Sequence, residues 1–224
     1  MDLRLEKVPF LGLFAIYVVK VVVAAGPTRE YIDDIRFISN GSSGLMGCAI
    51  ASEALSRGHE VVLVLGPTNV RAPDGVRVVD VVSADDMIDA VLEELKAGAD
   101  VLVSAAALAD YTPDEKIEGK IRSGGELTLR LKRTRKLIGE ARKMFPKLKI
   151  VAFKAEYGGT ENEMIDRGRS LLGVADLVVV NDVSEGVFGS SDNEVYIVGG
   201  NFVEHVGRCG KDVIAKRVLT KAGV

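Results

Sequence analysis

The strongest constraint on the fold is an alternation of short apolar runs with helical segments. Runs rich in Val, Leu and Ala are apolar on both faces, as strands buried in a parallel sheet are. They occupy residues 17–25, 60–65, 76–82, 100–106, 148–154 and 176–181. Helical patterns occupy residues 44–57, a segment capped by Ser83, and residues 134–145, 161–174 and 211–221. This order predicts an α/β fold, with a Rossmann-like, doubly wound, mainly parallel sheet and flanking helices.

Two segments depart from this alternation. Residues 126–131 alternate apolar and polar side chains, which is typical of a strand exposed on one face. Residues 193–206 hold two apolar runs around Gly199 and Gly200, which predicts an added β-hairpin. No linker-like composition divides the chain, so we expect one domain over residues 1–224. The basic helix at 211–221 is interpreted as a solvated surface.

The N-terminal segment is apolar. Residues 8–19 follow Arg4 and Lys7, as the core of a signal peptide would. Lys20 interrupts the run, which is then too short to span a bilayer. A cleaved signal is the alternative to an apolar leader over residues 1–16 that packs on the domain or on a partner. We expect a cytoplasmic protein with no membrane association.

Composition argues against two classes of function. The formal net charge is −3 at pH 7 and no basic patch is interleaved with aromatic residues, so a nucleic-acid partner is not expected. The two cysteines, Cys48 and Cys209, and the two histidines, His59 and His205, lack metal-ligand spacing. A His-based catalytic triad or a His-rich metal site is therefore disfavoured.

A glycine-rich turn precedes the first helical segment. Gly41, Gly44 and Gly47 recur at every third position, with Ser42 beside the first of them. Amides in such a turn approach phosphate or carboxylate closely, because glycine has no side chain and a helix N-terminus is electropositive. The alternative is that these glycines only allow tight packing of helix on strand. The turn comes late, because residues 26–40 separate it from the first strand.

A nicotinamide enzyme is one reading of that turn. It needs an acidic residue after the second strand, yet residues 60–65 run into Gly66 and Pro67. Short-chain dehydrogenases also need Tyr-x-x-x-Lys, and none of the five tyrosines has Lys four residues on. These observations disfavour an NAD(P)-dependent short-chain oxidoreductase. A non-enzymatic nucleotide-binding protein is the other alternative.

Small residues follow the fourth strand, where doubly wound sheets bind ligands. Ala105 and Ala106 let a flat ring or an acyl group lie against the backbone, and Asp110 offers an acceptor or a magnesium contact. An Ala-rich strand end with a helix-capping Asp is an equal alternative. The polar loop that follows carries Lys116 and Lys120, long cationic side chains suited to a triphosphate.

Taken in order, the motifs resemble one family, the phosphopantothenate–cysteine ligases, also called phosphopantothenoylcysteine synthetases. The resemblance rests mainly on GPTREYID and RFISNGSSGLMG, with shorter matches through FKAE, DLVVVNDVS and FGSSDNEV. The matches run from about residue 26 to residue 206. The chain is similar to the stand-alone prokaryotic type without the flavin-dependent decarboxylase domain, so no flavin is expected.

The resemblance implies a reaction in two steps. The carboxylate of 4′-phosphopantothenate attacks the α-phosphate of a nucleoside triphosphate and releases pyrophosphate. The amine of L-cysteine then attacks the acyl-nucleotide, giving 4′-phosphopantothenoylcysteine for coenzyme A biosynthesis. CTP with Mg²⁺ is the implied co-substrate, while Lys154, which matches eukaryotic members that prefer ATP, keeps ATP open. A homodimer is also implied.

The resemblance also implies roles for single residues. Asn40 matches a contact to the reacting acyl group, and Arg36 matches a residue that holds the phosphate of phosphopantothenate across the dimer interface. Lys120 matches a lysine that attends the triphosphate, with Lys116 as the alternative in the same loop.

Larger sets follow from the same match. Residues 26–40 are expected to form an arm that carries substrate contacts, and residues 107–125 a flexible active-site loop. Ala105 and Ala106 are implied to contact the acyl substrate as well as the nucleotide. The implied nucleotide pocket comprises Gly26, Gly41, Ser42, Gly44, Gly47, Ala105, Ala106, Asp110, Lys116, Lys120, Phe153 and Asn181.

Overall fold

A single large sheet forms the centre of the computed structural model, which describes residues 17–184 and 189–224. The eight strands lie in the order β12-β11-β10-β9-β6-β1-β4-β5. Their bounds are β1 Lys20–Ala25, β4 Glu60–Leu65, β5 Arg77–Asp80, β6 Val101–Ser104, β9 Lys149–Glu156, β10 Leu177–Asp182, β11 Asp192–Gly199 and β12 Val203–Gly210. The apolar leader expected at residues 1–16 lies outside the described residues, as does Phe188 in the last family motif.

The sheet is mainly parallel, which confirms the predicted fold class. Strand β1 pairs in parallel with β4 on one side and with β6 on the other, so the strand order reverses between β1 and β6. Strands β10 and β11 pair antiparallel, as do β11 and β12, which form the expected hairpin. Ligands of doubly wound sheets bind at the carboxyl ends of the strands beside such a reversal.

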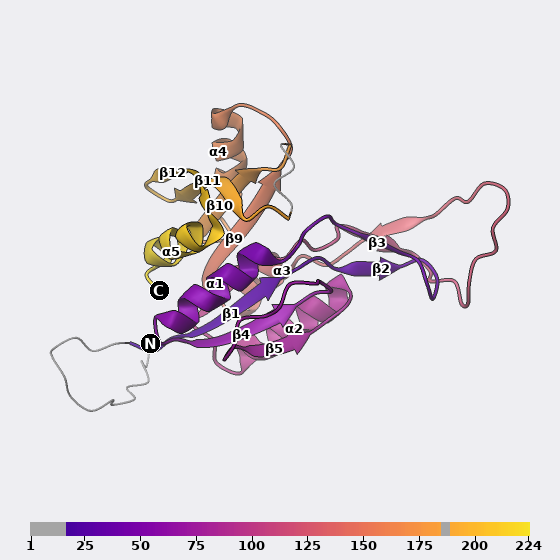
Figure 1. The fold of residues 1–224 in the computed structure, drawn as a ribbon, viewed down its shortest axis with the longest axis horizontal. Helices are drawn as coiled ribbons and strands as arrows, with labels where there is room; N and C mark the ends of the chain where they lie inside the picture. Colours follow the sequence, from indigo (N-terminus) through magenta and orange to yellow (C-terminus); the bar gives the residue numbers. More distant parts are fainter. Residues whose placement is uncertain (1–16, 185–188) are drawn as a thin grey trace.

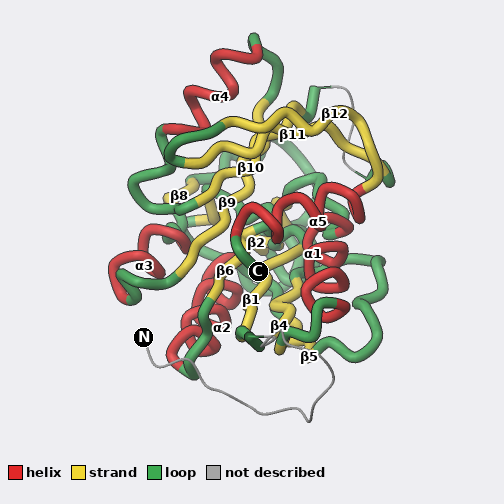
Figure 2. The backbone as a smooth tube through the Cα atoms, turned by 90° about the vertical axis from the view of Figure 1, so that its left-hand side faces the viewer, coloured by secondary structure: helices red, strands yellow, loops and turns green. Residues whose placement is uncertain are grey.

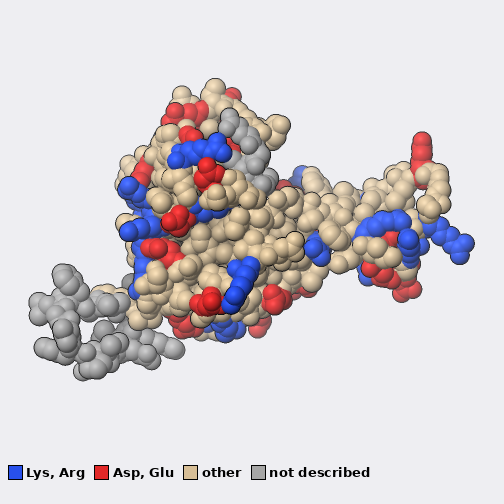
Figure 3. Space-filling view, viewed as in Figure 1, with Lys and Arg blue, Asp and Glu red and all other residues tan. Residues whose placement is uncertain are grey.

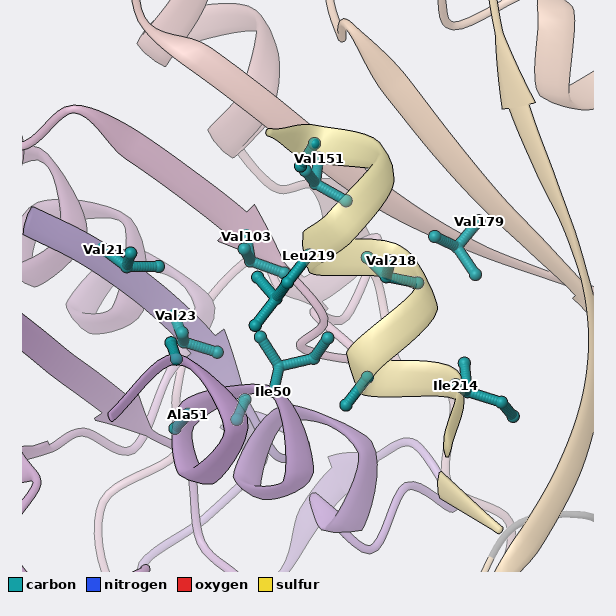
Figure 4. Close-up of a cluster of buried hydrophobic side chains, with 14 of the residues drawn as sticks. Val21, Val23, Ile50, Ala51, Val103, Val151, Val179, Ile214, Val218 and Leu219 are labelled. Atoms are coloured by element: carbon teal, nitrogen blue, oxygen red, sulfur yellow. The ribbon is translucent and has the colours of Figure 1, made fainter. Parts of the chain in front are cut away.

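Helices cover both faces of the sheet (Figure 2). Alternate residues of β1 point to opposite faces, so Val21 and Val23 enter one buried cluster while Val22 enters the other. The first cluster lies under α1 (Leu45–Ser56) and α5 (Lys211–Ala222), which pack side by side in Figure 4. The second lies under α2 (Ala84–Lys96), α3 (Leu137–Met144) and α4 (Glu161–Arg169).

The interpretation of residues 211–221 as a solvated helix is wrong for the inner face of α5. Ile214, Val218 and Leu219 are fully buried against α1 and the sheet. The basic residues Lys216, Arg217 and Lys221 lie on the outer side and mask this amphipathic pattern in the sequence.

An arm projects from the body of the molecule (Figure 1). In the structure the arm is larger than the expected segment 26–40. It contains two short antiparallel pairs, β2 (Arg29–Tyr31) with β3 (Phe37–Ser39), and β7 (Tyr111–Pro113) with β8 (Leu131–Arg133), together with the segment between β7 and β8. The strand predicted at 126–131 is wrong, because β8 begins at its last residue, which pairs with Pro113 at the end of β7. No described strand lies opposite residues 126–130, so their alternating pattern has no partner.

Gly47 sets how closely α1 approaches the sheet. A Cβ at this position would lie 2.3 Å from the Cβ of Ala25 in β1, well inside van der Waals contact. Gly47 therefore has the second of the two roles considered for the glycine turn, which is close packing of the helix on the strand. Because α1 lies this close, its first turn sits directly at the carboxyl end of β1.

We expect Gly47→Ala to destabilise the protein by about 1–3 kcal/mol, because the new methyl group overpacks a rigid contact. Gly139→Ala in α3 is the matched control, since the nearest heavy atom to its added Cβ is 4.0 Å away. That variant should gain about 0.5–1 kcal/mol from helix propensity. Urea denaturation of both variants measures the difference, and equal stabilities would contradict the assigned contact.

Candidate functional site

A cavity of about 120 Å³ lies at the carboxyl ends of the strands, beside the start of α1. It opens where the strand order reverses, which is the position expected for a ligand. The described residues that line it are Ser42, Ser43, Gly44, Leu45, Met46, Ala105, Ala106, Ala107, Phe153, Ala155, Asn181, Gly189, Asn193 and Lys211.

The start of α1 forms one wall. Gly44 adopts the left-handed conformation, with φ of 80°, and the helix begins without a side-chain cap. A Cβ on Gly44 would also lie 3.3 Å from the Cα of Gly26, so both backbone freedom and space favour glycine here. The hydroxyls of Ser42 and Ser43 accept backbone N–H groups nearby, and their own O–H groups remain as donors. This wall offers donors to an anion.

Small and aromatic residues form another part of the wall. Ala105 and Ala106 follow β6, while Phe153 and Ala155 project from one face of β9. Lys154 projects from the other face of β9, where its ammonium lies 2.8 Å from Glu156, and it does not line the cavity. This wall can receive a flat ring.

Six of the predicted pocket residues meet in the cavity: Ser42, Gly44, Ala105, Ala106, Phe153 and Asn181. Six others do not line it: Gly26, Gly41, Gly47, Asp110, Lys116 and Lys120. Gly26 instead shapes the neighbouring backbone, with φ of 82° and its carbonyl oxygen accepting from the amide of Ala107 at 2.9 Å.

Sequence reasoning missed two buried polar residues of the cavity, Asn193 and Lys211. Lys211 is the first residue of α5 and its side chain donates to the carbonyl oxygen of Ser190. Burial lowers the pKa of its ammonium, although the nearby charge of Asp192 opposes this effect. Lys211 was hidden within a run of lysines and arginines whose other members are exposed.

Asn40 lies at the edge of the cavity. Its Nδ2 donates to the carbonyl oxygens of Ala107 at 3.0 Å and Leu108 at 3.1 Å. Both amide hydrogens are therefore engaged, and the side-chain Oδ1 is the atom left to meet a ligand. The contact places Asn40 beside Ala107, which lines the cavity.

Arg36 and Lys116 lie on the arm rather than in the cavity. Asp33 is fully buried there and accepts the amides of Ile35, Arg36 and Ile121 at 2.8, 2.7 and 3.1 Å. The guanidinium of Arg36 donates to the carbonyl oxygen of Ile121 at 3.0 Å. These bonds join the β2–β3 turn to the segment that follows β7.

The two candidate triphosphate lysines differ in their surroundings. Lys116 forms an ion pair of 2.6 Å with Asp34, which lowers the pKa of that carboxyl and raises the pKa of the lysine. Lys120 is exposed on the same segment. Figure 3 shows charges of both signs gathered on this part of the arm.

Asp110 was expected to contact magnesium. In the structure its carboxylate forms an ion pair with Lys136, and both side chains are exposed. Among residues 17–184 and 189–224, no group of three or more His, Cys, Asp or Glu residues is placed to hold a metal ion. The described residues thus do not fit a resident magnesium site, although a triphosphate can bring Mg²⁺ with it.

The arm should loosen when the charge of Asp33 is removed. The amide of Arg36, with those of Ile35 and Ile121, holds the pKa of Asp33 below its ordinary value of 3.8. The ionised carboxylate of Asp33 therefore stabilises the folded arm above pH 3.8, and this stabilisation is lost as the pH falls through the lowered pKa. Asp33→Asn should speed hydrogen exchange at Arg36 and Ile121 by about tenfold while leaving β1 unchanged. Asp74→Asn, which alters an exposed pair with Arg71, is the control; unchanged exchange at Arg36 would contradict this anchor.

Within the described residues no helix is long and apolar enough to cross a membrane.

The chain is 42% identical over 203 residues to the coenzyme A biosynthesis bifunctional protein CoaBC of Thermococcus kodakarensis, covering 89% of this chain and 49% of that protein. The chain thus spans about half the length of the relatives it matches.

Solved structures give the same result. The C-terminal domain of a bifunctional CoaBC superposes with a TM-score of 0.74 at 32% identity, covering 91% of this chain and 93% of that one. The DNA/pantothenate metabolism flavoprotein from Streptococcus pneumoniae gives a TM-score of 0.80 at 26% identity, with 92% and 99% covered. Residues 17–223 match the family described as the DNA/pantothenate metabolism flavoprotein C-terminal domain. The chain belongs to this family.

Proposed function

We propose that this chain is a phosphopantothenate–cysteine ligase that acts in coenzyme A biosynthesis in the cytoplasm. The observation that carries the proposal is the cavity, whose described lining contains a buried lysine, two serines and two asparagines but no carboxylate. Such a lining favours an anionic ligand. Relatives of this chain bear a name that refers to coenzyme A biosynthesis, which supports the choice of pathway.

The proposed reaction brings negative charges together. A carboxylate attacks the α-phosphorus of a nucleoside triphosphate and displaces pyrophosphate, leaving an acyl-nucleotide. The amine of L-cysteine then attacks the acyl carbon and displaces the nucleoside monophosphate. Catalysis of this kind depends on positioning and on fixed donors more than on a general base. The uncapped start of α1 and the cavity lysine supply such donors.

We assign the base of the nucleotide to the wall of small residues and its phosphates to the start of α1. Phe153 and Asn181 lie on that wall, and Ala105 and Ala106 provide flat backbone for the ring. We infer CTP in preference to ATP. The one residue that pointed toward ATP, Lys154, faces away from the cavity and pairs with Glu156.

Asn40 is proposed to lie at the reacting acyl group. Because its two amide hydrogens bond to the backbone of Ala107 and Leu108, its Oδ1 is left to accept from the attacking amine of cysteine. Donation from this side chain to a developing oxyanion would require one of those bonds to break.

The arm is proposed to serve the active site of a second copy in a homodimer. It extends away from the body in Figure 1, and Ile35, Phe37 and Ile117 on it are exposed apolar residues that an interface would cover. Arg36 would then hold the phosphate of phosphopantothenate, and Lys120, exposed on the arm, would approach the triphosphate.

The proposed reaction is tested by mass spectrometry of products. With MgCTP, 4′-phosphopantothenate and L-cysteine, we expect one pyrophosphate and one CMP for each 4′-phosphopantothenoylcysteine formed. Omitting cysteine should leave an acyl-cytidylate and omitting phosphopantothenate should leave CTP intact. Parallel reactions with ATP, GTP and UTP establish the base preference. A folded sample that forms no product with any nucleotide would refute the proposed function.

The role of Asn40 is tested separately from the reaction as a whole. In Asn40→Ala we expect the acyl-nucleotide to form but its reaction with cysteine to slow by roughly 100-fold, because the acceptor that positions the attacking amine is lost. Asn201→Ala, in the exposed turn between β11 and β12, is the matched control. Full activity of Asn40→Ala in single-turnover quench experiments would show the assignment to be wrong.

A further inference from the structure

Lys211 is an unusual residue to find inside the body of the protein. Only 9% of it is exposed, and it is the one charged side chain among the described residues that line the cavity. Removing an ammonium from water is unfavourable unless hydrogen bonds or an opposite charge replace the lost solvent. The partners of Lys211 therefore indicate what the residue does.

The protein supplies Lys211 with only part of what a buried ammonium needs. Its Nζ donates to the carbonyl oxygen of Ser190, which uses one of three N–H donors. Asp192 is the nearest source of negative charge, but its carboxylate is bonded to Arg208 at 2.9 Å and to the hydroxyl of Ser190. Within the described residues no ion pair joins Lys211 to an acid. Two donors remain for a ligand in the cavity.

The surroundings of Lys211 also favour an anion. Asn193, only 7% exposed, uses its Oδ1 to accept the amide of Glu194, which leaves its NH₂ group as a donor to the cavity. The start of α1, a helix of 12 residues that has no side-chain cap, lines the same cavity. Donors from α1, β11 and α5 thus converge on one space.

We propose that Lys211 binds a phosphate group of the nucleoside triphosphate within the cavity, together with the start of α1. The inference rests on the proposed function and adds a contact to it. The cation that neutralises the triphosphate in the cavity comes from α5 of the same chain, whatever the lysines of the arm contribute from a partner. Charge-assisted hydrogen bonds to phosphate are among the stronger ones in proteins.

A structural role for Lys211 predicts different behaviour. If Lys211 only held the turn at Ser190, replacing it would destabilise the protein. The replacement would then change the affinities for a charged and for a neutral ligand to the same extent. A phosphate-binding lysine contributes to the affinity for a triphosphate but not to the affinity for the corresponding nucleoside. The free protein should then tolerate a neutral side chain, because a buried charge has been removed.

The experiment compares wild type with Lys211→Met and with Lys211→Gln, which can still donate to Ser190. Isothermal titration measures binding of CTP, inorganic tripolyphosphate and cytidine to each, with Lys216→Met on the exposed face of α5 as control. We expect both Lys211 variants to bind CTP and tripolyphosphate about 10- to 100-fold more weakly, with cytidine affinity unchanged. Thermal unfolding should occur at or above the wild-type temperature.

The outcomes separate this inference from the function on which it rests. Wild type that binds no nucleoside triphosphate would overturn both. Wild type that binds CTP, with Lys211 variants that bind it equally well or lose cytidine to the same extent, would overturn the phosphate contact alone. Failure of both Lys211 variants to fold would assign the residue a structural role and would also overturn the contact.

Discussion

The close packing of α1 on β1 is the contact on which the rest of the site depends. Gly47 has no side chain where a Cβ would overlap Ala25, so the helix lies directly on the strand. The first turn of α1 is thereby fixed at the carboxyl end of β1, where Gly44 adopts a left-handed conformation without a capping side chain. An uncapped helix start held against the backbone is a strong position for an anion.

Helix α5, which packs beside α1 on the same face of the sheet, places the charged side chain of Lys211 in the cavity. Arg57 donates to the carbonyl oxygens of Lys216 at 2.9 Å and Val224 at 2.6 Å, which ties the C-terminal half of α5 to the end of α1. With the helices held together in this way, Lys211 at the start of α5 lines the same cavity as the start of α1. The contacts that hold α1 and α5 together thus also bring their first residues to the same site.

Much of the body could be predicted from the sequence because its signals are local. Buried strands such as β1 and β4 are continuous apolar runs, and the capping box of Ser83 with Asp86 marks the start of α2. The arm could not be predicted in this way. Strands of three residues, such as β2 and β8, are too short for a periodic pattern. The turn between β2 and β3 depends on buried Asp33, which resembles any loop aspartate in the sequence.

The candidate site shows the same division. Motifs identified the residues at strand ends and in the glycine turn, because there both the residue type and its place after a predicted strand indicate a ligand contact. Lys211 could not be separated from its exposed basic neighbours, since burial depends on which face of α5 meets α1. For Gly47 the sequence left two roles open, phosphate contact and close packing; in the structure it permits close packing and does not line the cavity.

The central claim is that the cavity at the start of α1 is the nucleotide site. A crystal structure of the protein with MgCTP tests it most directly. We expect phosphate oxygens within hydrogen-bonding distance of the amide of Met46 and of Nζ of Lys211, with the base against Phe153. Phosphates held by other residues, with this cavity empty, would contradict it.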